Sequence, residues 1–433
     1  MSTSSVILVI FVVFFVTLFI GIPIGVSLCL TMFAAKIVMP AIPVDIGFVF
    51  RSLVASIDTY PILAVPVFIL CGNIMGTGGI SKRLFDFISY FIGNLTAGLP
   101  MAMVITCLFY GAISGSSPAT TAAVGAMTVP MLVDLGYDKK VVVSIVAIAG
   151  GLGVIIPPSI PFIWYGLTAN ESVSSLFLAG VIPGIVVGLC LCLFIYIYFK
   201  LHGEDKEKLH ANFSAIRAKG FMGVLKESIW ALLMPVIILG GIYSGIVTPT
   251  EAAAVATVYS VIIASFVYKT LKPQDYVGIL KDTASTMAPL MLVIGAAMAF
   301  GKVLALAGAT QAMTQMITSL CHNKVTFLLF TNLVFLFLGC VMDGCCAIII
   351  FTPIFLPVAV SFGMNPIHFG CLMIVNLALG FVTPPVGLNL YVASSMFDVP
   401  VMTIAKYAAP MMLVFIGALL LITFVPALSL VLL

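Results

Sequence analysis

Apolar stretches of 18 or more residues recur along the whole chain and are separated by short polar turns. Each stretch is long enough to cross a hydrocarbon layer of about 30 Å as an α-helix. We expect a first long span near residues 6–38 and a second near 48–75, and the pattern continues to the C-terminal region. The chain is therefore predicted to be an all-α polytopic membrane protein, and any soluble binding domain should be a separate chain.

Six glycines and prolines between residues 130 and 183 recur 227 residues later without a gap. The pairs are Pro130 and Pro357, Gly136 and Gly363, Gly153 and Gly380, Pro157 and Pro384, Pro158 and Pro385, and Pro183 and Pro410. Chance identity would give on the order of one such pair in a window of this length, so the match indicates duplicated architecture. We expect a first repeat half at 1–198 and a second at 229–433.

Charged residues gather between the two halves, at 199–228, and we interpret this segment as a linker. It contains six Lys and Arg residues, so the positive-inside rule favours a cytoplasmic location. The chain as a whole is 62% hydrophobic and only 8% charged, whereas about a quarter of residues are charged in soluble domains. The net charge is +3, but the Lys and Arg residues lie at segment ends and form no basic stripe. The sequence therefore predicts no nucleic-acid partner.

Two amphipathic segments, 80–94 and 308–320, occupy corresponding places in the two halves, and we expect them to form arm helices. Further along each half, glycines and prolines interrupt apolar segments that are otherwise long enough to be helical. We expect re-entrant hairpins at about 110–135 and 338–362. Broken helices should follow them at about 139–170 and 366–397, because proline lacks the amide proton that a continuous helix needs.

Non-helical backbone inside a membrane survives only where it is buried in protein or lines a cavity. The C-terminal ends of half-helices present carbonyl oxygens suited to Na⁺, while their N-termini present amide protons suited to carboxylates. The hydroxyls of Ser114, Ser116 and Ser117 lie at the first interruption and add oxygen ligands or substrate contacts. A packing kink would explain one interruption, but four at repeat-related positions favour a transport site.

Two isolated charges lie in apolar surroundings. Asp343 at the second hairpin is a candidate for handling substrate, ion or proton, and it could at the same time cap a helix. Lys302 is a candidate anion contact, with snorkelling to the membrane interface as the alternative. The serines at 114–117 are not in a Gly-x-Ser-x-Gly elbow and no histidine is placed as a general base, so we predict no enzymatic activity.

Three motifs resemble a known family: YGAISGSSPATTAAVG at 110–125, IIPPSIP at 155–161 and FVTPPVGLNL at 381–390. They are similar to the large membrane subunit of tripartite ATP-independent periplasmic (TRAP) transporters, and the likeness extends over essentially the whole chain. The resemblance implies an inverted-repeat, elevator-type transporter of the bacterial inner membrane. It also implies Na⁺-coupled import of an organic acid, of which C4-dicarboxylates and sialic acid are the two best-known classes.

The resemblance further implies two partners, a periplasmic substrate-binding protein and a small four-helix membrane subunit. The small subunit should be a separate chain, since no extra helical block precedes residue 6. A stand-alone carboxylate/Na⁺ symporter without partners is the alternative. Na⁺ is the expected coupling ion, and we expect no cofactor and no other metal.

Carried over by position, each hairpin tip and its neighbouring helix break would form one Na⁺ site. The expected ion-binding residues are Ser116, Gly150, Gly153, Pro157, Gly344, Gly380, Thr383 and Val386. The substrate should lie between the two tips. Its expected contacts are Ser114, Ser116, Ser117, Asp343, Asn389 and Lys302.

Overall fold

The computed structural model describes residues 3–40, 42–205, 208, 209, 213 and 217–433, and those residues form helices and turns without a strand. Eight helical segments of this part are long and apolar enough to cross a membrane, which agrees with the predicted all-α membrane protein. They are Tyr60–Thr77, Val173–His202, Gly220–Tyr243, Pro249–Val267, Asp275–Leu306, Lys324–Val341, Gly344–Ser361 and Val401–Phe424.

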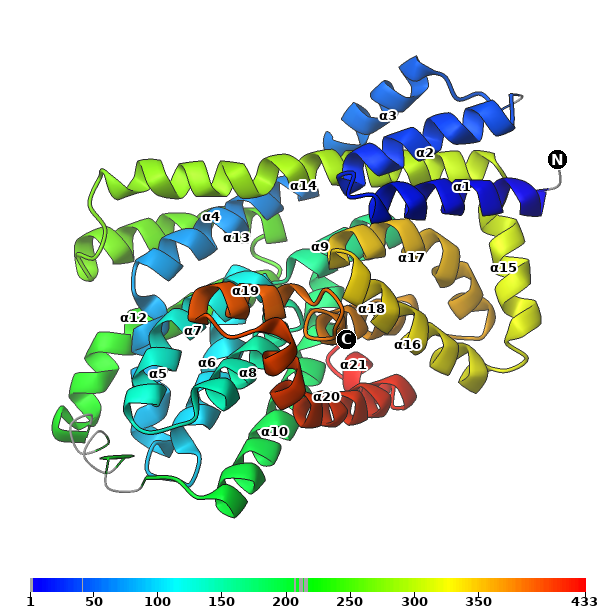
Figure 1. The fold of residues 1–433 in the computed structure, drawn as a ribbon. Coiled ribbons are helices and arrows are strands. Elements are labelled where there is room, and N and C mark those ends of the chain that lie inside the picture. Colours follow the sequence, from blue (N-terminus) through cyan, green and yellow to red (C-terminus); the bar gives the residue numbers. More distant parts are fainter. Residues whose placement is uncertain (1–2, 41, 206–207, 210–212, 214–216) are drawn as a thin grey trace.

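One group of helices, which we call the frame, is organised around the long helix α14 (Figure 1). α14 contacts α2, α3 and α4, while α13 packs on α4 and on α12. The members are α1 (Thr3–Phe19), α2 (Ile24–Val38), α3 (Ile46–Ile57), η1 (Tyr60–Leu63), α4 (Ala64–Thr77), α12 (Gly220–Tyr243), α13 (Pro249–Ile262), η3 (Ile263–Val267) and α14 (Asp275–Leu306).

The expectation of one long span at 6–38 is wrong, because the structure has two helices there that pack against each other. The break follows Phe19. Gly21 adopts a left-handed φ of +93°, which glycine tolerates and other residues disfavour. Pro23 then begins the second helix without donating an amide proton.

The second group, which we call the bundle, contains both hairpins and both broken helices (Figure 1). Two short helices, α5 (Ile80–Ile92) and α15 (Ala309–Leu320), lie in the segments predicted as arms and contact both groups. The bundle comprises α6 (Gly98–Ser114), α7 (Ser117–Asp134), α8 (Lys139–Ala149), η2 (Gly150–Val154), α9 (Ile160–Ala169), α10 (Val173–His202), α16 (Lys324–Val341), α17 (Gly344–Ser361), α18 (Pro366–Gly380), α19 (Leu388–Phe397), α20 (Val401–Phe424) and α21 (Ala427–Leu430).

Contacts within the bundle recur at the spacing of the duplicated sequence. α9 packs on α17 as α19 packs on α7, and α10 packs on α18 as α20 packs on α8. The hairpin helices start earlier than the expected boundaries of about 110 and 338. α6 begins at Gly98 after the left-handed residue Ala97, and Asn323 caps the start of α16, so each tip lies midway along its helix pair.

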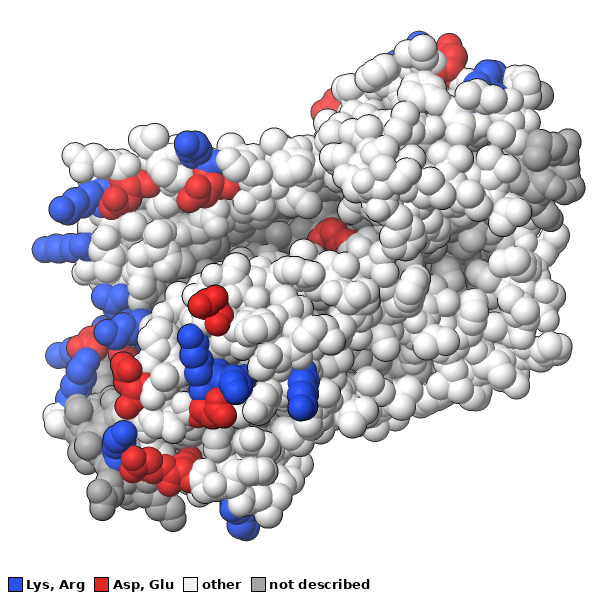
Figure 2. Space-filling view, in the orientation of Figure 1, with Lys and Arg blue, Asp and Glu red and all other residues white. Residues whose placement is uncertain are grey.

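Charged side chains are concentrated at one end of the molecule. Figure 2 shows most of the coloured atoms of this face around α5, α8, α12 and the start of α14, whereas the region of α15 to α17 is almost uncharged. The linker predicted at 199–228 begins within α10 and ends within α12. Residues 206, 207, 210–212 and 214–216 of this segment lie outside the described residues.

A polar cluster at this end joins three segments of the bundle. The half-buried carboxylate of Glu204 accepts a hydrogen bond from the amide of Ala97 at the start of α6, at 3.1 Å. It also accepts one from the Tyr137 hydroxyl, at 2.9 Å. Burial and, secondarily, this carboxylate raise the pKa of Tyr137, so the phenol stays a neutral donor. Glu204 thereby connects the end of α10 to both neighbours.

Substituting Glu204→Ala should lower the stability of the purified protein by about 1–3 kcal/mol, because two donors lose their acceptor. Glu204→Gln should lower it less, since the amide oxygen still accepts a hydrogen bond. Thermal unfolding followed by far-UV circular dichroism measures both effects. Equal unfolding midpoints for Glu204→Ala and wild type would show that the cluster contributes nothing.

Candidate transport site

A cavity of about 520 Å³ lies where the two hairpin tips meet the frame. The first tip contributes residues 114–119 and the second contributes Asp343 and Cys345. The frame supplies the opposite wall through Asn73 of α4 and Pro289 of α14. In Figure 2 the surface is hollowed between the layer of α14 and the rest of the molecule. The cavity thus combines residues from both halves of the sequence.

The first tip is a tight turn between α6 and α7. Gly115 ends α6 with a left-handed φ of 60°, and Ser116 is extended before Pro118 enters the first turn of α7. The Gly115 carbonyl accepts a hydrogen bond from the amide of Ile160, at 3.3 Å. The tip is therefore held directly against the start of α9, beyond the first helix break.

Oxygen atoms cluster between this tip and the break. The Ser114 and Thr120 hydroxyls are 3.0 Å apart, and Thr120 Oγ1 donates to the Ser116 carbonyl at 2.8 Å. Gly153 packs on this cluster so closely that a methyl group there would overlap Thr120 Oγ1. Hydroxyl and carbonyl oxygens are the ligands that hard cations prefer. The contributions of Ser116 and Gly153 to an ion site stay a prediction.

The rest of the first helix break is packed as tightly as the contact between Gly153 and Thr120. α8 changes to a 3₁₀ turn at Gly150, and non-helical backbone including Pro157 leads to α9. Gly150 lies against the Thr121 side chain, where a β-carbon would collide with the hydroxyl. A β-carbon on Gly111 of α6 would lie 2.5 Å from the α-carbon of Gly153. Glycine is required here because two backbones approach within contact distance.

The second tip has a different chemistry. Asp343 is the N-cap of α17, and its Oδ2 accepts a hydrogen bond from the amide of Cys345 at 2.9 Å. Gly344 lies under the ring of Phe381, which would be 2.8 Å from an added β-carbon. Gly380 approaches Gly339 of α16 as Gly153 approaches Gly111. The second half therefore repeats the close backbone packing but places a carboxylate at its tip.

The second break separates α18 from α19. Thr383 Oγ1 donates to the Leu379 carbonyl at 2.8 Å, so the expected side-chain oxygen lies at the end of α18. Gly387 begins α19 with a left-handed φ of 53°. Val386 is 39% exposed, so this part of the second break lies at the protein surface rather than in the packed interior.

The helix N-termini at the two tips differ in capping. The side chain of Ser116 accepts no bond from the first turn of α7, whereas Asp343 caps α17. The first amides of a helix have no partner within that helix. The start of α7 therefore offers amide donors and a positive dipole end to the cavity, which is the arrangement that binds anions.

Two predicted substrate contacts are not brought to the cavity wall. Asn389 is fully buried, and its amide nitrogen donates to the Ala147 carbonyl at 2.9 Å and to Ser117 Oγ at 2.8 Å. It joins α19 to α8 and α7, because its side chain faces the packed helices. Lys302 lies on α14, with its Nζ 3.3 Å from Ser56 Oγ of α3, and does not line the cavity.

The sequence analysis missed the polar residues on the frame side. Asn73 and Thr286 line the cavity, and the Asn73 amide donates to Thr283 Oγ1 at 2.9 Å. Asn73 is a polar residue within an apolar span, which is a usable signal for a functional position. Thr286 gives no comparable signal, since threonine is common in membrane helices.

Comparison with known proteins identifies similar membrane proteins. A family profile described as tripartite ATP-independent periplasmic transporter, DctM component, matches residues 11–428. The chain is 40% identical over 381 residues to the C4-dicarboxylate TRAP transporter large permease protein DctM of Pseudomonas aeruginosa, covering 88% of each chain. It is 34% identical over 387 residues to the sialic acid TRAP transporter large permease protein SiaM of Vibrio cholerae, covering 89% of each.

A further relative is longer than this chain. The isethionate TRAP transporter permease protein DctMQ of Oleidesulfovibrio alaskensis is 40% identical over 402 residues, which are 93% of this chain and 62% of that protein. All three relatives are named as transporter permeases rather than enzymes, in agreement with the prediction.

Among solved structures, the YdaH transporter of Alcanivorax borkumensis matches 93% of this chain and 97% of its own, with a TM-score of 0.64 and 15% identity. This likeness concerns the fold alone.

Proposed function

Because the chain belongs to the DctM component family of tripartite ATP-independent periplasmic transporters, we propose that it is the large membrane subunit of an organic-anion importer. It is a multi-pass membrane protein, of the inner membrane in bacteria. The main support for this proposal is the cavity between the two hairpin tips. Residues of the oxygen-rich breaks of both halves and an uncapped helix N-terminus meet there. We assign this cavity as the substrate site.

The uncapped start of α7 favours an anionic substrate group at the first tip. Ser114 and Ser117 line the cavity beside it, although the Ser117 hydroxyl is also hydrogen-bonded to Asn389. Asp343 would repel a second carboxylate at the opposite tip, because like charges in a membrane-embedded site are unfavourable. We therefore assign Asp343 to the coupling cation rather than to the anion itself.

Coupling to Na⁺ is supported by the oxygen sets at the two breaks. The first combines Ser114, Ser116 and Thr120, and the second has Thr383 at its break and the carboxylate of Asp343 at its hairpin tip. Each set is built where packed glycines hold the break against a hairpin. We propose that the bundle carries substrate and Na⁺ past the frame together, with α5 and α15 as the connecting arms.

The relatives are named for isethionate, C4-dicarboxylate and sialic acid, so the family name alone does not choose a substrate. We propose a small organic acid of the C4-dicarboxylate or sialic acid class. A periplasmic binding protein would deliver it, and a small membrane subunit would complete the permease.

Purified chain with its two partners, reconstituted in liposomes, should accumulate an organic acid when an inward Na⁺ gradient is imposed. A K⁺ gradient of the same size should give no accumulation, because the oxygen sets are proposed to select and couple Na⁺. Radiolabelled uptake over a panel of organic acids measures both the substrate and the ion dependence. Uptake that does not depend on the Na⁺ gradient would contradict the assignment of Na⁺ as the coupling ion.

Omitting the partner proteins separates the two modes of operation. The proposed importer should lose uptake when either partner is left out. Full uptake by this chain alone would instead favour a stand-alone carboxylate/Na⁺ symporter.

A further inference from the structure

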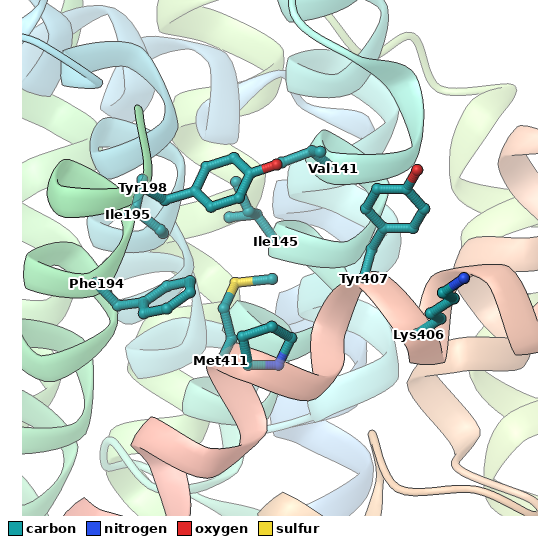
Figure 3. A pocket seen from close by; sticks show the side chains of 9 residues that line it. Val141, Ile145, Phe194, Ile195, Tyr198, Lys406, Tyr407 and Met411 are labelled. Atoms are coloured by element: carbon teal, nitrogen blue, oxygen red, sulfur yellow. The ribbon is translucent and has the colours of Figure 1, made fainter. Parts of the chain in front are cut away.

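A second cavity lies between α8, α10 and α20, away from the hairpin tips. We call it the interface groove; its volume is about 280 Å³. Figure 3 shows apolar side chains around it, among them Ile145 of α8, Phe194 of α10 and Met411 of α20. The groove uses the start of α8, the end of α10 and the start of α20, and none of the predicted substrate or ion residues lines it.

The duplicated sequence allows the groove to be compared with its counterpart. The shift of 227 residues carries Val141 of the groove onto His368 of α18. At that place the short helix α21 packs on both α10 and α18. His368 Nδ1 lies 3.2 Å from Ser429 Oγ, and Leu428 packs against the core. In the second half, the chain's own C-terminal turn therefore covers the equivalent position.

A single sequence difference explains why α20 ends where α10 continues. Pro426 follows the end of α20 and disfavours helical geometry at Val425, whose φ and ψ are −119° and 80°. The chain can then fold back as α21. Phe199 occupies the position equivalent to Pro426, and α10 continues through it to His202. The first residues after α10, 203–205, are not helical, and they line a hollow beside the groove together with Val141.

The groove has a polar mouth at the charged end of the molecule. Lys406 is exposed beside Tyr407, and Lys406 forms no ion pair within the described part of the chain. The Tyr198 side chain lines the same groove from α10. Tyr and Lys at helix ends are typical of a membrane–water interface, where an apolar body and a polar tip are both accommodated.

An adjoining hollow of about 190 Å³ shares Val141 and Tyr198 with the groove and carries the opposite charge. Asp138, Glu204 and Asp205 line it. Glu204 is already bonded to Ala97 and Tyr137, and Asp205 lies 3.8 Å from Lys208. Asp138 accepts a hydrogen bond from the amide of Lys140 at 2.8 Å and forms no ion pair within the described residues. A cation on one side and a carboxylate on the other complement a zwitterion.

We propose that the interface groove binds one amine-bearing zwitterionic phospholipid from the surrounding bilayer. An acyl chain lies between α8, α10 and α20, in the role that α21 has in the second half. The phosphate lies at Lys406 and the ammonium group points toward Asp138. The charges on both sides of Tyr198 distinguish this ligand from a simple fatty acid or an anionic lipid.

Native mass spectrometry of the purified, delipidated full-length protein tests the proposal. With added phosphatidylethanolamine, we expect one retained lipid per chain, and less retention of phosphatidylglycerol. Lys406→Gln should reduce the retention by about tenfold or more, because it removes the phosphate contact. Met411→Trp should do the same by filling the groove. The matched control is Lys281→Gln, since Lys281 is an exposed lysine of α14 that lines neither the groove nor the adjoining hollow, and this variant should bind as wild type.

Equal lipid retention by wild type, Lys406→Gln and Met411→Trp would contradict the proposal that the interface groove binds the lipid. Equal or stronger retention of phosphatidylglycerol would overturn the ammonium assignment. Because Lys406 is exposed, its substitution should leave the fold unchanged, so a folding defect of Met411→Trp would still leave Lys406→Gln as a decisive test. The measurement does not involve uptake, and its outcome is independent of the proposed transport function.

Discussion

Replacing Asp343 by asparagine should reduce Na⁺-driven uptake to about a tenth of the wild-type rate or less, while the protein stays folded. Asp343 both caps α17 and lines the cavity between the tips. Asparagine caps a helix about as well as aspartate, so the tip should keep its structure. Only the negative charge is lost, and with it the proposed attraction for the coupling cation.

Uptake by reconstituted protein at increasing Na⁺ concentration measures this effect. The matched control is Asp45→Asn, because Asp45 also caps a helix, accepting a bond from the amide of Phe48, but does not line the cavity. Uptake by Asp45→Asn should equal that of wild type. If Asp343→Asn shows the same uptake rate and the same Na⁺ dependence as wild type, Asp343 is not part of the ion site.

Substituting Gly153→Ala should also abolish most of the uptake. The added methyl group would overlap Thr120 Oγ1 and lie 3.0 Å from the Ser116 carbonyl oxygen. Forcing extra volume into a packed site costs about 1–3 kcal/mol and displaces the neighbouring groups. The displaced groups here are the oxygens of the first proposed Na⁺ site, so the Na⁺ concentration for half-maximal uptake should rise as the maximal rate falls.

Gly417→Ala on α20 is the matched control, since an added β-carbon there meets nothing within 4 Å. Combining Gly153→Ala with Thr120→Ala removes the shortest of the new contacts, the one with Thr120 Oγ1, and should restore part of the thermal stability. If the Thr120 hydroxyl is an ion ligand, uptake by this double variant stays low. Restored uptake with wild-type Na⁺ dependence would show that Thr120 only fills space.

The two tips illustrate how duplicated sequence gives unequal sites. Ser116 and Asp343 occupy equivalent positions under the shift of 227 residues, and each precedes the first turn of a hairpin helix. The serine leaves the amides of α7 open to the cavity, whereas the aspartate occupies those of α17. One tip therefore favours an anion and the other a cation, which supports the proposed coupled transport of both.

The sequence alone predicted the membrane-spanning character of the chain, the positions of both tips and breaks, and several oxygen-bearing residues around them. These features depend on local properties: the length of apolar stretches, the missing amide proton of proline, and the conformational freedom of glycine. Where a boundary depended on one residue's backbone geometry, as at Gly21 and Ala97, the prediction was less accurate.

Only the tertiary structure decided which polar side chains meet. Asn389 and Ser117 are 272 positions apart, and Lys302 contacts Ser56 rather than the cavity. The frame wall with Asn73 and the open groove beside Lys406 likewise depend on how distant helices pack. A hydrophobic pattern shows that a residue lies in a helix. The side of that helix facing a cavity is set by neighbours far away in the chain, and a single sequence does not specify those neighbours.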